Sequence, residues 1–258
     1  MKPVQYRFDG SFQGLLTCIF SAFDRKDNPI KIVGPNGQLD LFAETVDIIT
    51  NDLLAERVWN GIERIGGTTT CNHLYHAYLS MHEGVEIQIL LYCRLLFEKK
   101  APIFSDLGNA TILLIHKLDR KVLKEAHRVL MFIRFEQAAD GTFFGPFAPK
   151  YDVIPLVINH FKERFASQLW LIYDTKRDYG FFFDGKKVER VSVSNPNFIR
   201  ESGNLKTGIA DTTDNDWQEL WRTYFKNIAI AERKNLVVQQ NFMPKRFWKY
   251  LTEKKGGV

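Results

Sequence analysis

The sequence predicts an α+β protein, with a mainly helical N-terminal half packed on an antiparallel sheet that is followed by C-terminal helices. Apolar residues recur at helical spacing through most of residues 1–129, and beyond them the period of the pattern falls to two. Hydrophobic residues make up 45% of the chain and charged residues 25%, which is ordinary for a globular protein. We expect the regions 1–129 and 130–258 to pack as one unit, because no Pro-, Gly- or Ser-rich linker separates them.

Strands and helices alternate over the first 65 residues. The expected elements are a strand over residues 4–8, a helix over 11–23, short strands over 30–33 and 45–49, and a helix that begins at Asn51 or Asp52 and ends at Ile65. Asp9-Gly10 and Gly34-Pro35-Asn36-Gly37 supply turns between them, and Gly66-Gly67 ends the second helix. The chain therefore opens as β followed by α.

Helical spacing continues over residues 69–130. Two helices fit residues 69–99, with a break near Gly84, and a third covers about 107–130. This third helix is amphipathic, and its polar side carries Lys117, Arg120, Lys121 and Lys124.

The C-terminal half has the order β-β-α-β-β-β. The expected elements are a strand over 131–136, a hairpin turn at Asp140-Gly141 into 142–144, a helix with Pro155 in its first turn, and strands over 169–173, 179–183 and 187–193. The polar stretch 195–214 is typical of a surface loop, after which Thr213 and Asp216 favour the start of another helix. Pro244 then begins a short basic, aromatic helix.

Cysteine usage and hydropathy indicate a cytoplasmic protein. Cys18, Cys71 and Cys93 are odd in number and widely spaced, so we expect buried thiols in a reducing compartment. The longest apolar run, 85–97, is too short and too polar to span a bilayer, and the N-terminus does not read as a signal peptide. We therefore expect no association with a membrane. The sequence does not predict an oligomeric state.

Basic residues are concentrated near the C-terminus. Residues 225–258 contain eight Lys and Arg against two acidic residues, whereas the preceding residues are almost balanced in charge. This asymmetry favours an anionic partner, and a solvated basic tail is the alternative.

Several signatures of common enzymes are missing from the sequence, including the phosphate-binding P-loop, the dinucleotide-binding fingerprint and the nucleophile elbow. Cys71-x-His73-x-x-His76, with His82, superficially resembles a metal-binding set. It lacks a second cysteine pair or a carboxylate at zinc spacing, so we interpret these histidines as surface or core residues. We expect neither a metal nor a cofactor.

Charged and aromatic residues alternate between Arg134 and Phe183. The catalytic candidates are His160, Asp174 and Asp152, since a histidine beside a carboxylate can act as a general base. Arg134, Arg164 and Arg177 are candidates for holding a phosphate, and Trp170 for stacking a base. The preferred cluster is His160, Arg164, Asp174 and Arg177. The alternative is that the aromatic residues form the core and the charges form a buried or rim network.

The C-terminal segment combines cations with aromatic rings, as binding of a nucleic-acid strand without sequence preference would require. The binding candidates there are Arg233, Lys245, Arg246, Trp248 and Lys249. In the alternative interpretation, Trp248 and Tyr250 dock on the core and the lysines are solvated.

Most of the chain resembles a known family. The central motifs are Arg134-Phe135-x-x-x-x-Asp140-Gly141, Pro149-x-Tyr151-Asp152-Val153-x-Pro155-Leu156, His160-Phe161-x-x-Arg164-Phe165 and Gln168-x-Trp170-x-Ile172-Tyr173-Asp174-x-x-Arg177-x-Tyr179-Gly180. The ending, with Trp217-x-x-Leu220-Trp221 and Met243-Pro244-Lys245-Arg246-x-Trp248-Lys249, and the opening Tyr6-x-Phe8-Asp9-Gly10-Ser11 agree with it. These residues resemble an uncharacterised bacterial family described as DNA metabolism proteins linked to radical SAM enzymes. Gly145 and Phe247 depart from it, since the family has Ala and Tyr there.

The resemblance implies a setting rather than a reaction. Members of the family are found beside a radical SAM protein with a helix-hairpin-helix DNA-binding region, and relatives of this domain of unknown function are joined to uracil-DNA glycosylase-like domains. This sequence has neither a glycosylase domain nor a cysteine cluster for an iron-sulfur centre, so those chemistries would belong to a partner.

Three functions remain open. The first is a DNA repair or modification protein that binds nucleic acid through its basic aromatic surface and acts with a radical SAM partner. The second is an enzyme that uses His160 or Asp174 as a base and arginines to hold a phosphate-bearing substrate. The third is a protein-interaction scaffold with an aromatic C-terminal interface. Salt-dependent binding to DNA, loss of turnover in His160→Ala, or binding to a protein partner alone would distinguish them.

Overall fold

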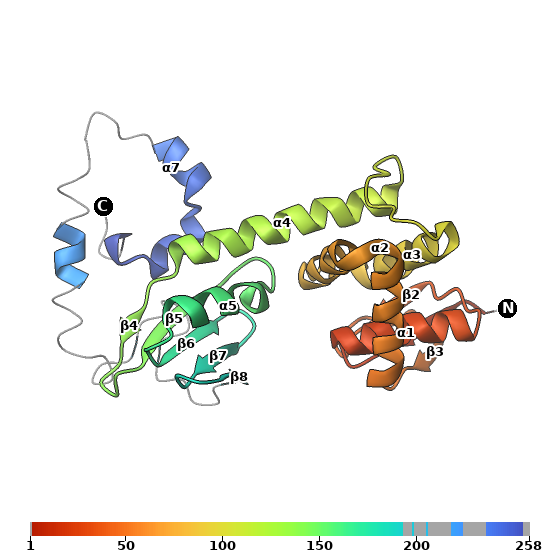
Figure 1. Ribbon diagram of the computed structural model, residues 1–258, viewed down its shortest axis with the longest axis horizontal. Helices are drawn as coiled ribbons and strands as arrows, with labels where there is room; N and C mark the ends of the chain where they lie inside the picture. Colours follow the sequence, from red (N-terminus) through yellow and green to blue (C-terminus); the bar gives the residue numbers. More distant parts are fainter. Residues whose placement is uncertain (1, 193–197, 199–204, 206–217, 224–235, 255–258) are drawn as a thin grey trace. The chain divides into compact units, whose positions relative to one another are not determined.

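A computed structural model describes residues 2–192, 198, 205, 218–223 and 236–254 (Figure 1). The chain divides into two compact units, Met1–Lys124 (unit 1) and Glu125–Val258 (unit 2). Unit 1 contains a parallel three-stranded sheet, and unit 2 contains a mixed five-stranded sheet. The predicted α+β class is confirmed.

The sheet of unit 1 has β1 (Val4–Arg7) at its centre, between β2 (Lys31–Val33) and β3 (Glu44–Asp47). Both neighbours run parallel to β1, and helix α1 (Phe12–Asp24) lies in the connection from β1 to β2. Ser11 caps α1, because its hydroxyl accepts the N–H of Gly14 at 2.9 Å. The predicted β-α opening and both short strands are confirmed.

Helix α2 (Asp52–Leu79) contains a kink that matches the predicted break. Gly67 has φ 75° and ψ 168°, a conformation that side chains disfavour and that lies outside the helical region. The helix resumes beyond it and ends at Leu79, and α3 (Val85–Lys99) follows from Gly84, which is left-handed. The predicted break near Gly84 is therefore confirmed as well.

The core of unit 1 forms where α1, α2 and α3 pack with β1. Its largest fully buried side chains include Tyr6, Tyr92, Leu15, Ile19, Ile62, Leu74 and Ile89. All three cysteines are buried and none forms a disulfide, as the sequence predicted.

Helix α4 (Ala110–Phe132) contributes residues to both units and extends further than expected. A strand was predicted over 131–136, but the helix continues to Phe132 and the strand β4 is only Glu136–Gln137. The prediction was wrong because Val122, Val129 and Ile133 continue a buried helical stripe, and the N–H of Ile133 donates to the Val129 carbonyl at 2.9 Å.

The sheet of unit 2 has the strand order β4-β5-β6-β7-β8. The other elements are β5 (Phe143–Phe147), α5 (Ile154–Arg164), β6 (Trp170–Asp174), β7 (Tyr179–Phe183) and β8 (Val188–Val191). The predicted order β-β-α-β-β-β is confirmed. The sheet is mixed rather than wholly antiparallel, because α5 is a crossover that brings β6 parallel to β5.

The described C-terminal residues, 236–254, form helical turns. These are α7 (Leu236–Phe242) and two 3₁₀ helices, η2 (Lys245–Tyr250) and η3 (Thr252–Lys254). Pro244 precedes η2, as predicted. The predicted loop over 195–214 and the capping pair Thr213 and Asp216 lie largely or wholly outside the described residues, although 218–223 is helical. Within the described residues no helix combines the length and hydropathy that a bilayer span requires.

Candidate functional site: charged clusters, a basic helix face and a cleft

Asp174 and Arg177 form a buried ion pair at the turn between β6 and β7. Asp174 is 0% exposed. Its Oδ1 accepts the N–H groups of Lys176 and Arg177 at 2.9 and 3.1 Å, and its Oδ2 accepts a guanidinium N–H of Arg177 at 2.6 Å. Burial raises the pKa of Asp174, and the bonds from Arg177 oppose that rise.

Arg177 also connects this turn to the loop before α5. Its guanidinium donates to the carbonyls of Pro149 at 3.2 Å and Lys150 at 3.0 Å. Both oxygens of Asp174 and the guanidinium of Arg177 are therefore engaged within the protein. This arrangement fixes a turn, and it resembles the buried network that the sequence left open as the alternative.

Two more buried carboxylates of unit 2 pair with arginines. Glu253 accepts N–H groups from Arg134 at 2.9 Å and from the indole of Trp221 at 3.1 Å. Burial alone would raise the pKa of Glu253, but its backbone hydrogen bond, Arg134 and Trp221 together hold the pKa below its ordinary value.

Glu125, on α4, pairs with Arg246 of η2, and it also accepts the N–H of Lys150 at 2.8 Å. Arg128 approaches the same carboxylate at 3.5 Å. Arg134 and Arg246, both predicted to hold phosphate, thus join distant segments of unit 2 through buried carboxylates.

The preferred cluster divides into two parts. His160 and Arg164 are exposed on α5, whereas Asp174 is buried and bonded to Arg177. Trp170 is 1% exposed and packs against Phe161 and Phe183, at ring distances of 6.5 and 5.2 Å. The expectation that Trp170 stacks a base is therefore corrected, because its ring lies in the core and presents no face to a ligand.

Asp152 pairs with a tyrosine. It accepts a hydrogen bond from the hydroxyl of Tyr179, whose pKa is raised by burial and by the nearby Asp152 charge. The guanidinium of Arg190 lies over the Tyr179 ring, 4.3 Å from its centroid. Asp152 thus anchors β7 to the start of α5.

The C-terminal candidates are partly docked. The Trp248 indole donates to the Met243 carbonyl at 2.9 Å, and Lys254 lies 4.9 Å from its ring centroid. Tyr250 is buried, as the docked alternative predicted, whereas Lys245 and Lys249 are exposed. Arg233 lies outside the described residues.

Two histidines of the superficial metal set, His73 and His76, meet a carboxylate of α4. His76 Nδ1 lies 2.7 Å from Asp119 Oδ1, His73 Nε2 lies 4.0 Å from Asp119 Oδ2, and Asp119 is buried. Burial lowers the pKa of His73, whose ring stacks on Phe104. Cys71 is buried, and no group of metal-ligating residues is found in the part of the chain that the structure describes.

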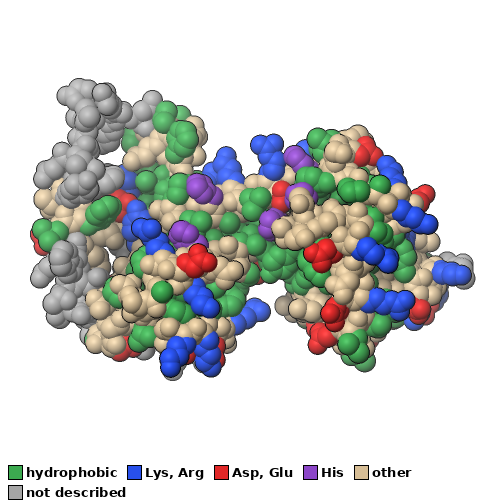
Figure 2. All heavy atoms as spheres, in the orientation of Figure 1, with side chains coloured by type: hydrophobic (Ala, Val, Ile, Leu, Met, Phe, Trp, Pro, Cys, Tyr) green, Lys and Arg blue, Asp and Glu red, His purple; other side chains and the backbone are tan. Residues whose placement is uncertain are grey.

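One face of α4 is basic and exposed. Lys117 and Lys124 flank the adjacent Arg120 and Lys121 at spacings of three residues, which places all four on one side of the helix, and all four are exposed. None of the four forms an ion pair with a described residue. The space-filling view shows Lys and Arg side chains projecting over this helix (Figure 2). The basic face of α4, as we call these four residues, was present in the sequence pattern but was not selected there as a site.

The two units also differ in charge. Unit 1 contains 14 Lys and Arg against 14 Asp and Glu, whereas residues 125–258 contain 21 against 16. The net charge of +5 therefore belongs to unit 2. At least three of its acids are buried in pairs with arginine.

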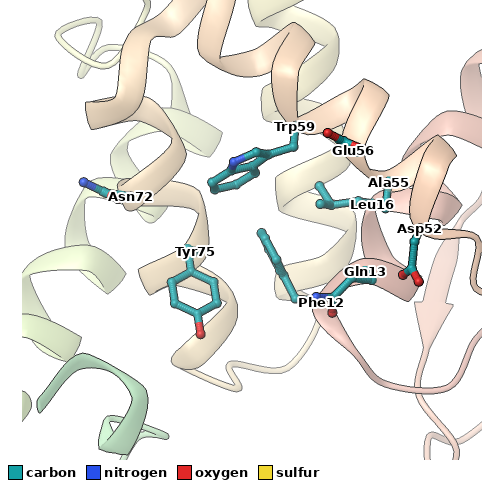
Figure 3. Close-up of a pocket in the computed structure, with 9 residues that line it drawn as sticks. All are labelled: Phe12, Gln13, Leu16, Asp52, Ala55, Glu56, Trp59, Asn72 and Tyr75. Atoms are coloured by element: carbon teal, nitrogen blue, oxygen red, sulfur yellow. The ribbon is translucent and has the colours of Figure 1, made fainter. Parts of the chain in front are cut away.

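A cleft opens between α1 and α2 in unit 1 (Figure 3). Its volume is about 590 Å³, and it is lined by Phe12, Gln13, Leu16, Asp52, Ala55, Glu56, Trp59, Asn72 and Tyr75. The ring of Phe12 meets Trp59 and Tyr75 edge to face, with centroids 5.5 and 5.1 Å apart. No sequence motif marks this α1–α2 cleft, because Phe12, Trp59 and Tyr75 are far apart in the sequence.

In the part of the chain that the structure describes, the fold and these surfaces define an α+β protein with a basic helix face, an ion-paired C-terminal unit and an aromatic cleft. A family model matches residues 83–253, and the chain belongs to that family, described as Domain of unknown function (DUF4130). No curated protein and no solved structure matches the chain. The matched segment includes α3, α4 and most of unit 2, whereas the residues that line the α1–α2 cleft precede it.

Proposed function

We propose that the protein binds nucleic acid in DNA metabolism and acts with a radical SAM partner. The observation that carries the proposal is the basic face of α4, where four exposed cations form no ion pair with any residue that the structure describes. Phosphate neutralisation by Lys and Arg supplies most of the affinity of proteins that bind nucleic acid without reading its sequence.

The spacing of these cations suits a phosphate backbone. Lys124 lies seven positions after Lys117, which corresponds to about 10 Å along a helix. Cations spread over that length can contact several phosphates along one strand, since the charges of a single strand lie roughly 3.4 Å apart along a duplex. Arg164 on α5 and Lys245 on η2 add exposed positive charge in unit 2.

The partner is supported by the resemblance of the central and C-terminal motifs to a family linked to radical SAM enzymes. In this proposal the partner contributes the radical chemistry and its own helix-hairpin-helix contacts, and this chain contributes a strand-binding surface. Contacts of this kind position a nucleic acid and carry little sequence information.

The test measures binding of the full chain to labelled single-stranded, duplex and uracil-containing DNA by fluorescence anisotropy over a series of salt concentrations. One variant replaces Lys117, Arg120, Lys121 and Lys124 by Gln. If each contacts one phosphate, the slope of log K against log salt on duplex DNA should become less steep by about 3 to 4.

A control of equal charge replaces Lys2, Arg64, Lys176 and Lys186, which are exposed cations on other segments. We expect this control to change the slope by less than one, because scattered charges act only through the general field. A second variant, Lys245→Gln with Lys249→Gln, tests the contribution of η2. It keeps Arg246, because removing Arg246 would leave the buried carboxylate of Glu125 without its cation.

If the α4 variant and its control lose DNA affinity and salt dependence to the same extent, the basic face of α4 is not the binding site. Absence of binding to every DNA at the lowest salt would refute the proposal. The enzyme and scaffold alternatives would then remain. Loss of turnover in His160→Ala would test the enzyme, and binding of a protein partner would test the scaffold.

A further inference from the structure

We propose that the α1–α2 cleft of unit 1 binds an organic cation, whose ammonium or guanidinium group lies against aromatic rings and between two carboxylates. The site is separate from the basic face of α4, and the proposal does not depend on nucleic-acid binding. It rests on the shape, walls and charge of the cleft.

The shape of the cleft follows from the kink in α2. Gly67 adopts φ 75°, which interrupts the helix, so that residues on both sides of the kink line the cleft. Trp59 comes from the first segment and Tyr75 from the second, and Phe12 at the start of α1 lies between them (Figure 3). The volume of about 590 Å³ falls within the range of small-molecule sites.

The aromatic walls are held in place by their neighbours. Phe12 contacts Tyr78 as well as Trp59 and Tyr75, at a centroid distance of 5.0 Å, and the Tyr78 hydroxyl donates to the Gly10 carbonyl at 2.6 Å. Trp59 and Tyr75 are only partly buried. They are thus ordered before a ligand arrives and still present surface to the cleft, which reduces the entropy lost on binding.

The charge of the cleft is negative. Asp52 and Glu56 lie one turn apart on α2, and the lining contains no Lys or Arg. Neither carboxylate forms an ion pair with a residue that the structure describes. A pair of unneutralised carboxylates disfavours phosphates and carboxylates as ligands and favours a cation.

The remaining polar groups suit a cation that carries N–H donors. Gln13 and Asn72 line the cleft and are exposed, and each offers an amide oxygen that can accept a hydrogen bond. Aromatic faces attract cations through their quadrupoles, most strongly for Trp. Aromatic rings, carboxylates and amide oxygens together match an alkylammonium or alkylguanidinium group with an apolar stem.

Such a group has two sources, a free amine or a Lys or Arg side chain of another protein. Isothermal titration calorimetry of the full chain distinguishes the two sources. Agmatine and spermidine serve as free cations, and acetyl-Gly-Arg-Gly-amide serves as the peptide. Tighter binding of agmatine or spermidine would assign a small molecule, and tighter binding of the peptide would assign a protein side chain. Adenosine monophosphate serves as an aromatic anion of similar size.

The variants separate aromatic from charge recognition. Trp59→Leu should weaken cation binding about tenfold, as expected for loss of a partly desolvated cation–π contact. The double change Asp52→Asn and Glu56→Gln should weaken it by a similar factor. The matched control, Asp24→Asn with Glu98→Gln, removes two exposed carboxylates elsewhere in unit 1 and should leave the affinity within about twofold.

Three results would overturn the proposal. In the first, adenosine monophosphate binds as tightly as agmatine. In the second, the cleft carboxylate variant and its control lose cation affinity equally. In the third, no cation binds at millimolar concentration. The far-UV circular dichroism of each variant shows whether a loss of binding reflects unfolding, and Trp59→Phe provides an aromatic replacement that should restore part of the affinity.

Discussion

Units 1 and 2 use their charged residues in different ways. In unit 1 the charges balance, and ion pairs such as Arg7 with Asp47 and Lys99 with Asp106 are exposed. In unit 2 the buried carboxylates Glu125, Asp174 and Glu253 each pair with an arginine. The first kind of pair adds little to stability, whereas breaking the second leaves a charge buried without a partner.

This difference changes which arginines of unit 2 can be considered for binding. Arg134, Arg177 and Arg246 look like phosphate ligands in the sequence, yet each is engaged by a buried acid. Exposed cations without a buried acidic partner among the described residues are the better candidates, and four of them share the polar face of α4 in unit 1. Net charge alone would not have separated these two groups.

The largest expected effect contrasts one arginine from each unit. Arg177→Gln leaves Asp174 buried without its cation, and we expect a loss of about 3 to 5 kcal/mol in the free energy of unfolding. Arg7→Gln removes an exposed pair and should change stability within experimental error. Urea unfolding followed by far-UV circular dichroism measures both. Similar losses in the two variants would contradict the contrast between the units.

A second prediction concerns pH and Glu253. The pKa of Glu253 is lowered in the folded protein, so the charged carboxylate stabilises the fold above the ordinary pKa of 4.5, and this contribution disappears as the pH falls through the folded value. Glu253→Gln should therefore destabilise the protein by about 2 kcal/mol at pH 7, the scale of hydrogen bonds to a charged group.

The difference in unfolding free energy between the natural protein and Glu253→Gln should shrink as the pH falls below 4.5. Asp174, whose pKa is raised, changes the unfolding free energy with pH in the opposite direction. It is present in both proteins, so its contribution cancels in the difference. A difference that is constant between pH 7 and pH 3 would show that the charge of Glu253 does not stabilise unit 2.

The smallest expected changes in stability concern two glycines of α2 in unit 1. Gly67 has φ 75°, so Gly67→Ala should destabilise the protein by about 1 kcal/mol. Gly61 is helical, and an added Cβ would meet Phe97 at 3.5 Å, an ordinary contact. Gly61→Ala should therefore stabilise the protein by roughly 0.5 to 1 kcal/mol. Thermal unfolding midpoints measure both, and shifts of the same sign would refute the assigned kink.

Much of the fold was predictable because its signals are local. Helical spacing predicted α1, α3 and most of α4, and Asp140-Gly141 predicted the hairpin between β4 and β5, where Gly141 has φ 83°. The boundary of α4 was missed, because an apolar run such as Met131 to Phe135 fits a strand and a helix equally well over so short a length.

The pairing of charges could not be predicted, since it joins residues that are far apart in the sequence. Arg134 meets Glu253 across 119 residues, and Glu125 meets Arg246 across 121. No local sequence pattern predicts such a contact. The α1–α2 cleft was missed for a related reason, because Phe12, Trp59 and Tyr75 become neighbours only after α1 and α2 have packed.

The buried cysteines of unit 1 make the basic face of α4 open to chemical mapping. Burial raises the pKa of Cys18 to about 12 and that of Cys71 to about 11, and it raises the pKa of Cys93 as well. Maleimide reagents react with the thiolate, so these native thiols should remain unmodified in the folded chain. A thiol introduced by Lys121→Cys would then accept a photocrosslinker selectively, and the nucleotides captured by it would give the path of a bound strand along α4.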